Sequence, residues 1–177
     1  MKKVKARACS NIALVKYWGK RNIKLNLPAV ASISITLDAL YTDTSVVFDK
    51  KRTADGLVLN GQESAERDRV RLSKFLDLIR KRAGISDFAL VESVNNFPTS
   101  AGLASSASSF ACLTLAASRA AGLSMDKDEL SLFARIGSGS AARSVYGGFV
   151  EMKLGEKEDG ISGGGIREAG RVPDRAP

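Results

Sequence analysis

Hydrophobic and polar positions alternate along the first part of the chain in the way that β-strands require. Residues 4–9 show this alternation, and so do two runs on either side of Asp38–Ala39 in ISITLDALYTDTSVVFD. We therefore expect a short first strand and then a hairpin that turns at Asp38–Ala39. Residues 11–28, dense in lysine, asparagine, tyrosine and tryptophan, predict a loop. Asn60–Gly61 predicts a tight turn.

Helical spacing follows in three places. Residues 67–83 have apolar side chains at i, i+3, i+4 and i+7 and are followed by Gly84, which predicts an amphipathic helix ending there. A second apolar face leads from Ala107 to Gly122. A third helix is expected after Asp126, because a glutamate three residues later forms a capping box. With further strands expected over 88–94 and in GFVEM, the pattern predicts an α+β domain with helices packed on a mostly antiparallel sheet.

Composition excludes several kinds of chemistry. The 177 residues contain no histidine, which rules out Ser-His-Asp catalysis, Cys-His catalysis and histidine-ligated metals. Two cysteines are too few for a disulfide framework, so a reducing cytoplasm is expected. No run reaches the roughly 18 apolar residues of a membrane span, and the basic N-terminus lacks the apolar core of a secretory signal.

The net charge of +8 suggests an anionic partner without identifying it. Nucleic acid, anionic lipid and phosphorylated small molecules are all attracted to a basic surface. Solvated basic faces with no specific partner are the simpler alternative. The positions of the charges within motifs have to decide between these possibilities.

Three motifs carry candidate chemistry. GLASSAS, residues 102–108, follows a strand and opens a helix, where free N–H groups and the helix dipole favour a phosphate, although the P-loop pattern and its lysine are absent. GSGSAAR, residues 137–143, combines two serines with an arginine fork suited to a carboxylate or phosphate. KYWGK, residues 16–20, interleaves lysines with aromatics, as nucleic-acid surfaces do. Each motif also has a structural alternative: a helix start, a C-cap turn and a core tryptophan anchor, respectively.

Together these motifs resemble the diphosphomevalonate decarboxylase family of the GHMP kinase superfamily. The resemblance rests on SNIALVKYWGKRNIKLNLP, NNFPTSAGLASSAS and ARIGSGSAARSVYGGFVEM, which occur in that order between about Lys5 and Lys153. It implies a ribosomal protein S5 domain 2-like N-terminal domain of the GHMP kinase fold over residues 1–153. It also implies ATP- and Mg²⁺-dependent decarboxylation of (R)-5-diphosphomevalonate to isopentenyl diphosphate, within isoprenoid, and hence lipid, biosynthesis. We expect a cytoplasmic homodimer that binds neither nucleic acid nor membrane.

The implied reaction suits a site without histidine. Phosphorylation of the tertiary 3-hydroxyl makes a good leaving group, and departure of the carboxylate relieves the positive charge that develops at the tertiary carbon. The protein has to position three anions and stabilise charge, which needs no covalent nucleophile.

The resemblance assigns roles by matching positions. Lys16 and Arg143 would be catalytic, with Lys16 facing the reacting centre or the transferred phosphate and Arg143 gripping the carboxylate. The residues that would bind ATP are Gly102, Leu103, Ala104, Ser105, Ser106 and Ser108, with Ser105 or Ser106 near Mg²⁺. The residues that would bind substrate are Tyr17, Trp18, Gly19, Lys20, Arg71, Ser138, Gly139, Ser140, Ala141, Ala142 and Arg143. Arg69 is a neighbouring candidate for the role of Arg71.

Two departures from the family pattern affect these expectations. The family reads N-S-S where this chain has Val30–Ala31–Ser32, which removes an amide and a hydroxyl beside the site. Family members are also longer, and their second half carries an aspartate that acts as base on the 3-hydroxyl; no aspartate here stands in a matching context. We therefore expect an N-terminal portion of the enzyme without the C-terminal GHMP domain, in which ligand contacts persist and turnover is lost. Residues 154–177, rich in glycine and charge, are expected to form a disordered or non-native tail.

Two rival functions remain. Phosphomevalonate decarboxylases and mevalonate 3-kinases share the scaffold and differ in the number of substrate phosphates and in the base. A basic RNA-binding module is the rival from another class, because the implied fold resembles a ribosomal-protein domain. Acidic residues interleave with the basic ones, as in ERDRVRLSK, instead of leaving a basic stripe with stacking aromatics, which argues against RNA.

Overall fold

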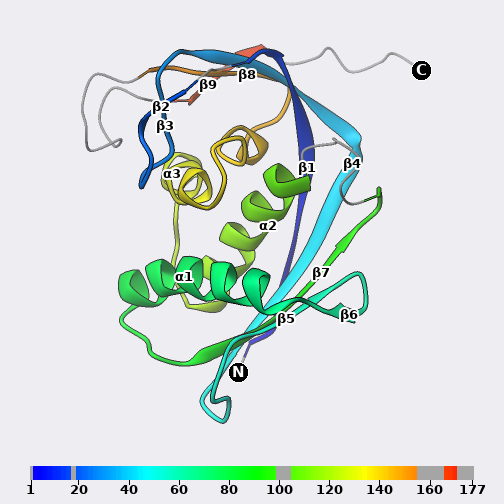
Figure 1. Cartoon of the computed structure of the whole chain (residues 1–177), viewed down its shortest axis with the longest axis vertical. Helices are drawn as coiled ribbons and strands as arrows, with labels where there is room; N and C mark the ends of the chain where they lie inside the picture. Colours follow the sequence, from blue (N-terminus) through cyan, green and yellow to red (C-terminus); the bar gives the residue numbers. More distant parts are fainter. Residues whose placement is uncertain (1, 17–18, 99–104, 155–165, 171–177) are drawn as a thin grey trace.

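The structure is a computed structural model, and it describes residues 2–16, 19–98, 105–154 and 166–170. A seven-stranded sheet carries three α-helices on one of its faces (Figure 1). The helices are α1 (Glu66–Ala83), α2 (Ser105–Ala120) and α3 (Lys127–Gly137). This arrangement confirms the expected α+β class and places the start of α2 and the end of α3 close to each other.

The long strand β4 (Ser32–Asp49) organises the sheet. The sheet order is β6-β5-β7-β4-β8-β9, with β1 paired to β4 as well, and every pairing is antiparallel except that of β5 with β7. The remaining elements are β1 (Val4–Val15), β2 (Lys20–Asn22), β3 (Leu27–Pro28), β5 (Gly56–Leu59), β6 (Gln62–Glu63), β7 (Phe88–Asn95), the 3₁₀ helix η1 (Arg143–Val145), β8 (Phe149–Met152) and β9 (Ile166–Gly170). Strands β2 and β3 form a separate small sheet.

The hairpin expected at Asp38–Ala39 is wrong, because β4 continues through these residues as one strand. The pairing with β1 jumps from Cys9↔Tyr41 to Ser10↔Leu37, so the intervening residues bulge out of the ladder. The side chain of Asn96 supports the bulge: its Nδ2 donates to the Ala39 carbonyl at 2.8 Å and its Oδ1 accepts from the Tyr41 N–H at 2.7 Å. A side chain distant in sequence therefore satisfies the backbone groups that a hairpin turn would have satisfied.

The loop expected over residues 11–28 is also wrong in part. Strand β1 continues to Val15, and two short strands follow within the same segment. Ser10 and Asn11 interrupt the apolar pattern of this strand, although both residues are buried. Asn11 Nδ2 donates to the Ser144 hydroxyl at 2.7 Å, so a polar residue fits inside this strand.

The local helix signals are confirmed. Helix α1 ends at Gly84 in the left-handed conformation with φ of 67°, and the Asp126 carboxylate accepts from the Glu129 N–H at 2.8 Å at the start of α3. The expected tight turn is present as well, with positive φ at both Asn60 and Gly61. Within the described ranges, no helix combines the length and apolar character needed to cross a lipid bilayer.

The main core lies between the sheet, α1 and α2. It is built from aliphatic and aromatic side chains, and Phe75 of α1 meets Phe110 of α2 edge to face with ring centroids 5.3 Å apart. The buried members are Val46, Phe48, Leu72, Phe75, Leu76, Ile79, Ala89, Val91, Leu113, Ala116 and Ala117. Small residues on α2 let this helix lie close to the sheet, which fixes the position of its N-terminal turn.

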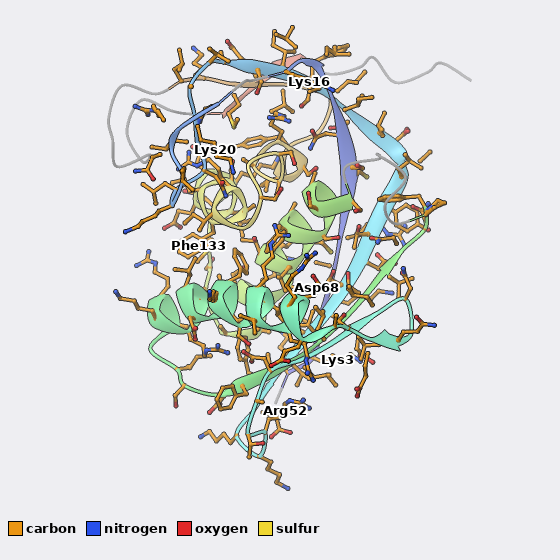
Figure 2. All side chains as sticks on the ribbon, in the orientation of Figure 1. Lys3, Lys16, Lys20, Arg52, Asp68 and Phe133 are labelled. Atoms are coloured by element: carbon orange, nitrogen blue, oxygen red, sulfur yellow. The ribbon has the colours of Figure 1, made fainter. Side chains whose placement is uncertain are left out.

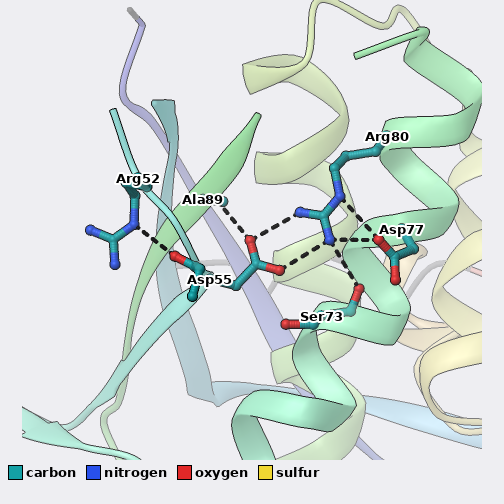
Figure 3. A network of polar contacts seen from close by, with 7 residues as sticks. Arg52, Asp55, Ser73, Asp77, Arg80 and Ala89 are labelled. Carbon is teal, nitrogen blue, oxygen red and sulfur yellow. Dashed lines mark hydrogen bonds and ion pairs between the residues drawn. The ribbon is translucent and has the colours of Figure 1, made fainter. Parts of the chain in front are cut away.

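A buried ion pair between Arg80 and Asp55 joins the C-terminal part of α1 to the sheet (Figure 3). Arg80 donates through both terminal nitrogens to Asp55, at 2.9 and 3.0 Å, and the Asp55 side chain is 0% exposed. Asp55 also accepts from the Ala89 N–H at 2.8 Å, and Arg80 contacts Asp77 at 2.7 Å. The two buried charges are thus paired and hydrogen-bonded, which is the condition for tolerating them inside a protein.

The end of the chain departs from the expectation of a disordered tail. Residues 166–170 form strand β9, which extends the sheet by pairing with β8. The expectation of disorder therefore does not hold for these five residues, and the rest of the tail beyond Leu154 lies outside the described residues. The predicted closing strand β8 is present but is not the last strand.

Candidate functional site

A groove of about 540 Å³ lies between α1, the start of α2 and strands β5 and β7. One part of its wall is apolar and another part carries hydroxyl, amide, guanidinium and carboxylate groups. The apolar lining consists of Leu57, Leu59, Leu72, Val91, Phe110 and Leu113. The polar lining consists of Thr44, Asn60, Gln62, Glu63, Ser64, Arg67, Asp68, Arg71, Ser93, Asn95, Ser105, Ser106 and Ser109. Such a combination suits a ligand with a flat apolar part and an anionic part.

The first residues of α2 form the end of this groove that is suited to bind an anion. Ser105 and Ser106 open a helix of 16 residues and are partly exposed. The first N–H groups of a helix lack intrahelical partners and lie at the positive end of its dipole. The two serines predicted to hold a nucleotide phosphate and Mg²⁺ therefore lie on the wall of the groove.

Ser108, which is predicted to contact ATP, does not line the groove. The residue is 0% exposed, and its hydroxyl is bonded to Thr42 Oγ1 at 2.7 Å and to the Ser105 carbonyl at 3.3 Å. Thr42 in turn donates to Asn95 Oδ1 at 2.6 Å. Ser108 consequently fixes the start of α2 to β4 and does not face a ligand.

The second small-residue turn lies beside the start of α2. Ser106 Oγ and Ser138 Oγ are 3.2 Å apart, and Ser138 Oγ is 3.3 Å from Ser140 Oγ. Two motifs that are 32 residues apart in sequence therefore meet through their hydroxyl groups. A serine predicted to bind ATP and a serine predicted to bind substrate are therefore neighbours.

Ala141 and Ala142, which are predicted to bind substrate, have buried side chains, so only their backbone groups could take part. They are 0% and 1% exposed, and Ala141 packs against Ala111 and Ala134 in a small second core. Gly139 is buried as well. The small side chains are needed for this packing, so the serines and Arg143 are the groups of the turn with side-chain chemistry to offer.

Arg143 lies at the inner end of the same cluster and is 3% exposed. Its Nη1 donates to Ser32 Oγ at 3.0 Å and its Nη2 to Asn11 Oδ1 at 3.4 Å. Asn11 also donates to the Ser140 carbonyl at 3.0 Å. Both of these acceptors of Arg143 are uncharged, so they orient the guanidinium without neutralising it.

Asn11 and Ser32 were missed as site residues by the sequence reading. Ser32 is the hydroxyl that remains where the family pattern has N-S-S, and it now holds Arg143. The one local signal for Asn11 was its position, as a polar residue directly before the apolar run IALV that leads into KYWGK. Its partners lie 129 to 133 residues away, and no local pattern reveals them.

Arg71 joins the groove to the turn. Its Nη2 donates to the Gly137 carbonyl at 2.8 Å, and its guanidinium lies over the Phe110 ring at 4.6 Å from the ring centre. Such stacking holds an arginine in place while leaving other donors available. Arg69, the neighbouring candidate on the same helix, lines a different hollow that also contains Asp55. The structure therefore favours Arg71 over Arg69.

The lysines of the first motif are placed less directly. Lys16, directly after β1, and Lys20, at the start of β2, are both exposed, and Figure 2 labels their side chains. Gly19 accepts a backbone bond from Ala29, which ties the segment to the strand after it. Tyr17, Trp18 and Gly102–Ala104 fall outside the described residues, so their predicted roles stay predictions.

Burial changes the acidity of groups around the site. It lowers the pKa of the Arg135 guanidinium at the end of α3, and the positive charge of Arg21 lowers it further. Burial raises the pKa of the Cys112 thiol on α2 to about 11, so this cysteine is a neutral packing residue. No cluster of three or more acidic, cysteine or histidine residues occurs in the described part of the chain. A divalent cation would therefore need ligand oxygens from a bound phosphate in addition to the serines.

Comparisons with known proteins agree with this geometry. The family model for the diphosphomevalonate decarboxylase-like N-terminal domain matches residues 8–162. The diphosphomevalonate decarboxylase of Homo sapiens is 46% identical over 165 residues, which covers 85% of this chain and 40% of the human protein. The chain thus spans about 40% of the length of that relative.

Solved structures give the same relationship. The mevalonate diphosphate decarboxylase from Enterococcus faecalis, described for its mevalonate diphosphate mediated ATP binding, is 44% identical with a TM-score of 0.87. That match covers 97% of this chain and 51% of the other. A structure of MDDEF in complex with MVAPP, AMPPCP and magnesium is 44% identical with a TM-score of 0.86, over 97% of this chain and 50% of that one.

Proposed function

We propose a function from one premise: the chain belongs to the diphosphomevalonate decarboxylase-like N-terminal domain family. The proposed function is to bind ATP and (R)-5-diphosphomevalonate side by side, for ATP-dependent decarboxylation to isopentenyl diphosphate. Because the chain spans about 40% of the human relative, the decarboxylation is proposed for a protein that includes this domain. We also propose a homodimer in the cytoplasm; Cys9 and Cys112 are both free, as a reducing compartment allows.

The observation that carries the proposal is the hydrogen-bonded line between the groove and Arg143. Ser106 at the groove meets Ser138, Ser138 meets Ser140, and Asn11 links the Ser140 carbonyl to Arg143. Arg71 reaches the same turn through Gly137. A phosphate at the start of α2 and a substrate held by the turn would therefore be neighbours, which a phosphoryl transfer between them requires.

The groove suits a nucleotide by the chemistry of its two parts. The aliphatic lining from β5 and β7 is proposed to take the base, and the start of α2 with Arg71 is proposed to take phosphates. Mg²⁺, which bridges nucleotide phosphates and neutralises developing charge, fits the hydroxyls of Ser105 or Ser106 with the Asp68 carboxylate at the groove wall. The described residues fit a metal that arrives with the nucleotide better than a resident one.

Arg143 is proposed to hold the substrate carboxylate. Its guanidinium is charged, buried and oriented by Ser32 and Asn11, so a carboxylate bound there would be fixed in direction. Lys16 and Lys20 are proposed to approach the transferred phosphate and the substrate diphosphate, respectively. Their exposure leaves both ammonium groups able to move toward a ligand.

Thermal stabilisation by ligands tests the proposed function. We expect Mg-AMPPCP and diphosphomevalonate each to raise the melting temperature of the chain, because a ligand that binds only the folded state stabilises it. Arg143→Gln should abolish the response to diphosphomevalonate and keep the response to Mg-AMPPCP, and Arg71→Gln should weaken both responses. Arg69→Gln, two residues away on α1, should behave like the unchanged chain.

Two results would count against the proposed function. A chain that neither ligand stabilises, or that Arg69→Gln impairs as much as Arg71→Gln, would contradict the proposal. Replacing diphosphomevalonate with the monophosphate separates the proposed substrate from that of a phosphomevalonate decarboxylase. Stabilisation by the monophosphate alone would favour the second enzyme.

A further inference from the structure

Three hydrogen bonds fasten the β2–β3 hairpin to the end of α3. Asn26 Nδ2, at the tip of the hairpin, donates to the carbonyls of Arg135 and Ile136, each at 2.9 Å. In the opposite direction, Arg135 Nε donates to the Leu25 carbonyl at 3.2 Å. The last carbonyls of a helix lack intrahelical partners, so one side-chain amide here satisfies two of them.

The hairpin is shaped to present Asn26. Its φ is 49°, in the left-handed region that asparagine tolerates better than most residues, and its N–H donates to the Ile23 carbonyl. Asn22 Oδ1 accepts from the Leu25 N–H at 3.1 Å, which closes the turn from the other side. The tip is therefore ordered by its own bonds, and the amide of Asn26 is aimed at α3.

The two elements that Asn26 joins each lead to residues of the proposed substrate site. Helix α3 ends at Gly137 and continues directly into the Ser138–Arg143 turn. Lys20 lies on β2, where it pairs with Pro28 of β3. The two bonds from Asn26, together with the bond from Arg135 Nε to the Leu25 carbonyl, therefore link the lysine-bearing hairpin to the end of α3.

We infer that Asn26 is a positioning residue for the substrate anion: it holds the Lys20-bearing hairpin against the Ser138–Arg143 turn. This inference rests on the proposed function, since it assigns Lys20 and the turn to one ligand. Asn26 itself touches no reacting group. The nucleotide groove is lined mainly by α1, α2, β5 and β7, and none of these elements contacts Asn26 in the bonds described. Nucleotide binding should therefore be independent of the clamp, by which we mean the bonds from Asn26 to the end of α3.

Two substitutions test the inference without disturbing the hairpin backbone. Asn26→Asp keeps the shape and the tolerance for positive φ but cannot donate to the two carbonyls. Asn26→Gly keeps the backbone conformation and removes the donor. Ile23→Ala is the matched control, because Ile23 lies in the same hairpin and its side chain is 79% exposed.

Titrations with diphosphomevalonate and with Mg-AMPPCP measure the two affinities, and amide hydrogen exchange measures the order of the two segments. We expect both Asn26 variants to bind diphosphomevalonate about tenfold more weakly, the size of one to two lost hydrogen bonds. Mg-AMPPCP should bind them as it binds the unchanged chain, and amide hydrogen exchange should accelerate in residues 20–28 and 137–143. Equal weakening for both ligands, or an unchanged affinity for diphosphomevalonate, would overturn the inference.

The exchange measurement keeps the inference separate from the proposed function. If the unchanged chain binds no diphosphomevalonate, the proposed function fails and the exchange rates decide about the clamp. Faster exchange in both segments of both Asn26 variants, but not in Ile23→Ala, would support the coupling. Exchange that accelerates in the hairpin alone, or in neither segment, would refute it.

Discussion

Asp55 shows how a single buried carboxylate fixes one end of the molecule. It joins the segment after β4 to α1 through Arg80 and to β7 through the Ala89 N–H (Figure 3). The pair is held by three elements, so its charges have no freedom to separate and hydrate. Its contribution is therefore best measured by removing one partner.

We expect Asp55→Ala to lower the free energy of unfolding by about 3–5 kcal/mol, because Arg80 would be left buried without its main partner. Asp77→Ala is the control: Asp77 contacts the same guanidinium, but its side chain is 65% exposed, so its loss should cost less than about 1 kcal/mol. Urea unfolding followed by circular dichroism measures both values. Equal destabilisation by the two substitutions would show that burial of the pair is unimportant.

For individual residues, the sequence identified the charged and hydroxyl side chains of the site but could not tell which of them were buried. Ser106 and Ser138 were expected at one site and their hydroxyls do meet. Ser108 belongs to the same serine-rich run, yet it faces β4, because a helix turns consecutive residues to different sides. Asn11 was missed since its partners lie in a turn more than 120 residues away.

Among the elements, those determined by local signals were predicted and those determined by distant contacts were not. The helices follow from apolar spacing and from caps at Gly84 and Asp126, which are local properties. The bulge in β4 depends on Asn96, which the sequence reading had no reason to pair with residues near 40. Strand β9 likewise has little apolar character of its own and forms by pairing with β8.

Gly137 at the end of α3 lies directly against Phe110 of α2. A Cβ built on this glycine would lie 2.1 Å from Phe110 Cδ1, which is far inside contact distance. The lack of a side chain therefore lets the end of α3 reach the ring on which Arg71 lies. Close approach of the two helices and placement of Arg71 depend on the same residue.

We expect Gly137→Ala to displace Phe110 and to destabilise the fold by about 1–3 kcal/mol, as overpacking does. Because Phe110 lines the groove, binding of Mg-AMPPCP should weaken as well. Gly147→Ala is the matched control, since a Cβ there would meet no atom within 4 Å. Thermal unfolding with and without nucleotide checks both effects, and a Gly137→Ala protein as stable as Gly147→Ala would contradict the predicted contact.

At the scale of the whole molecule, the sheet face without helices changes character along β1 and β4. Near one end it is charged: Arg7 contacts Asp43 at 2.8 Å, and this bond holds the pKa of the Asp43 carboxyl below its ordinary value. Near the other end it is apolar, with Ile12, Leu14 and Ile33 exposed by 51%, 58% and 37%. One face thus has an end suited to water and an end suited to contact with another apolar surface.

The apolar end predicts association of the isolated chain. Apolar side chains gathered on an uncovered sheet face lower their free energy by meeting another such surface, and here they come from two paired strands, with Val15 opposite Ile33. Sedimentation velocity should therefore show a mass that rises with concentration for the unchanged chain and stays monomeric for Leu14→Lys. Val94→Lys adds the same charge to an exposed apolar position of β7, next to the charged end of β4, and should associate like the unchanged chain. If Val94→Lys suppresses association as strongly as Leu14→Lys, net charge governs the behaviour and the apolar end of the sheet does not.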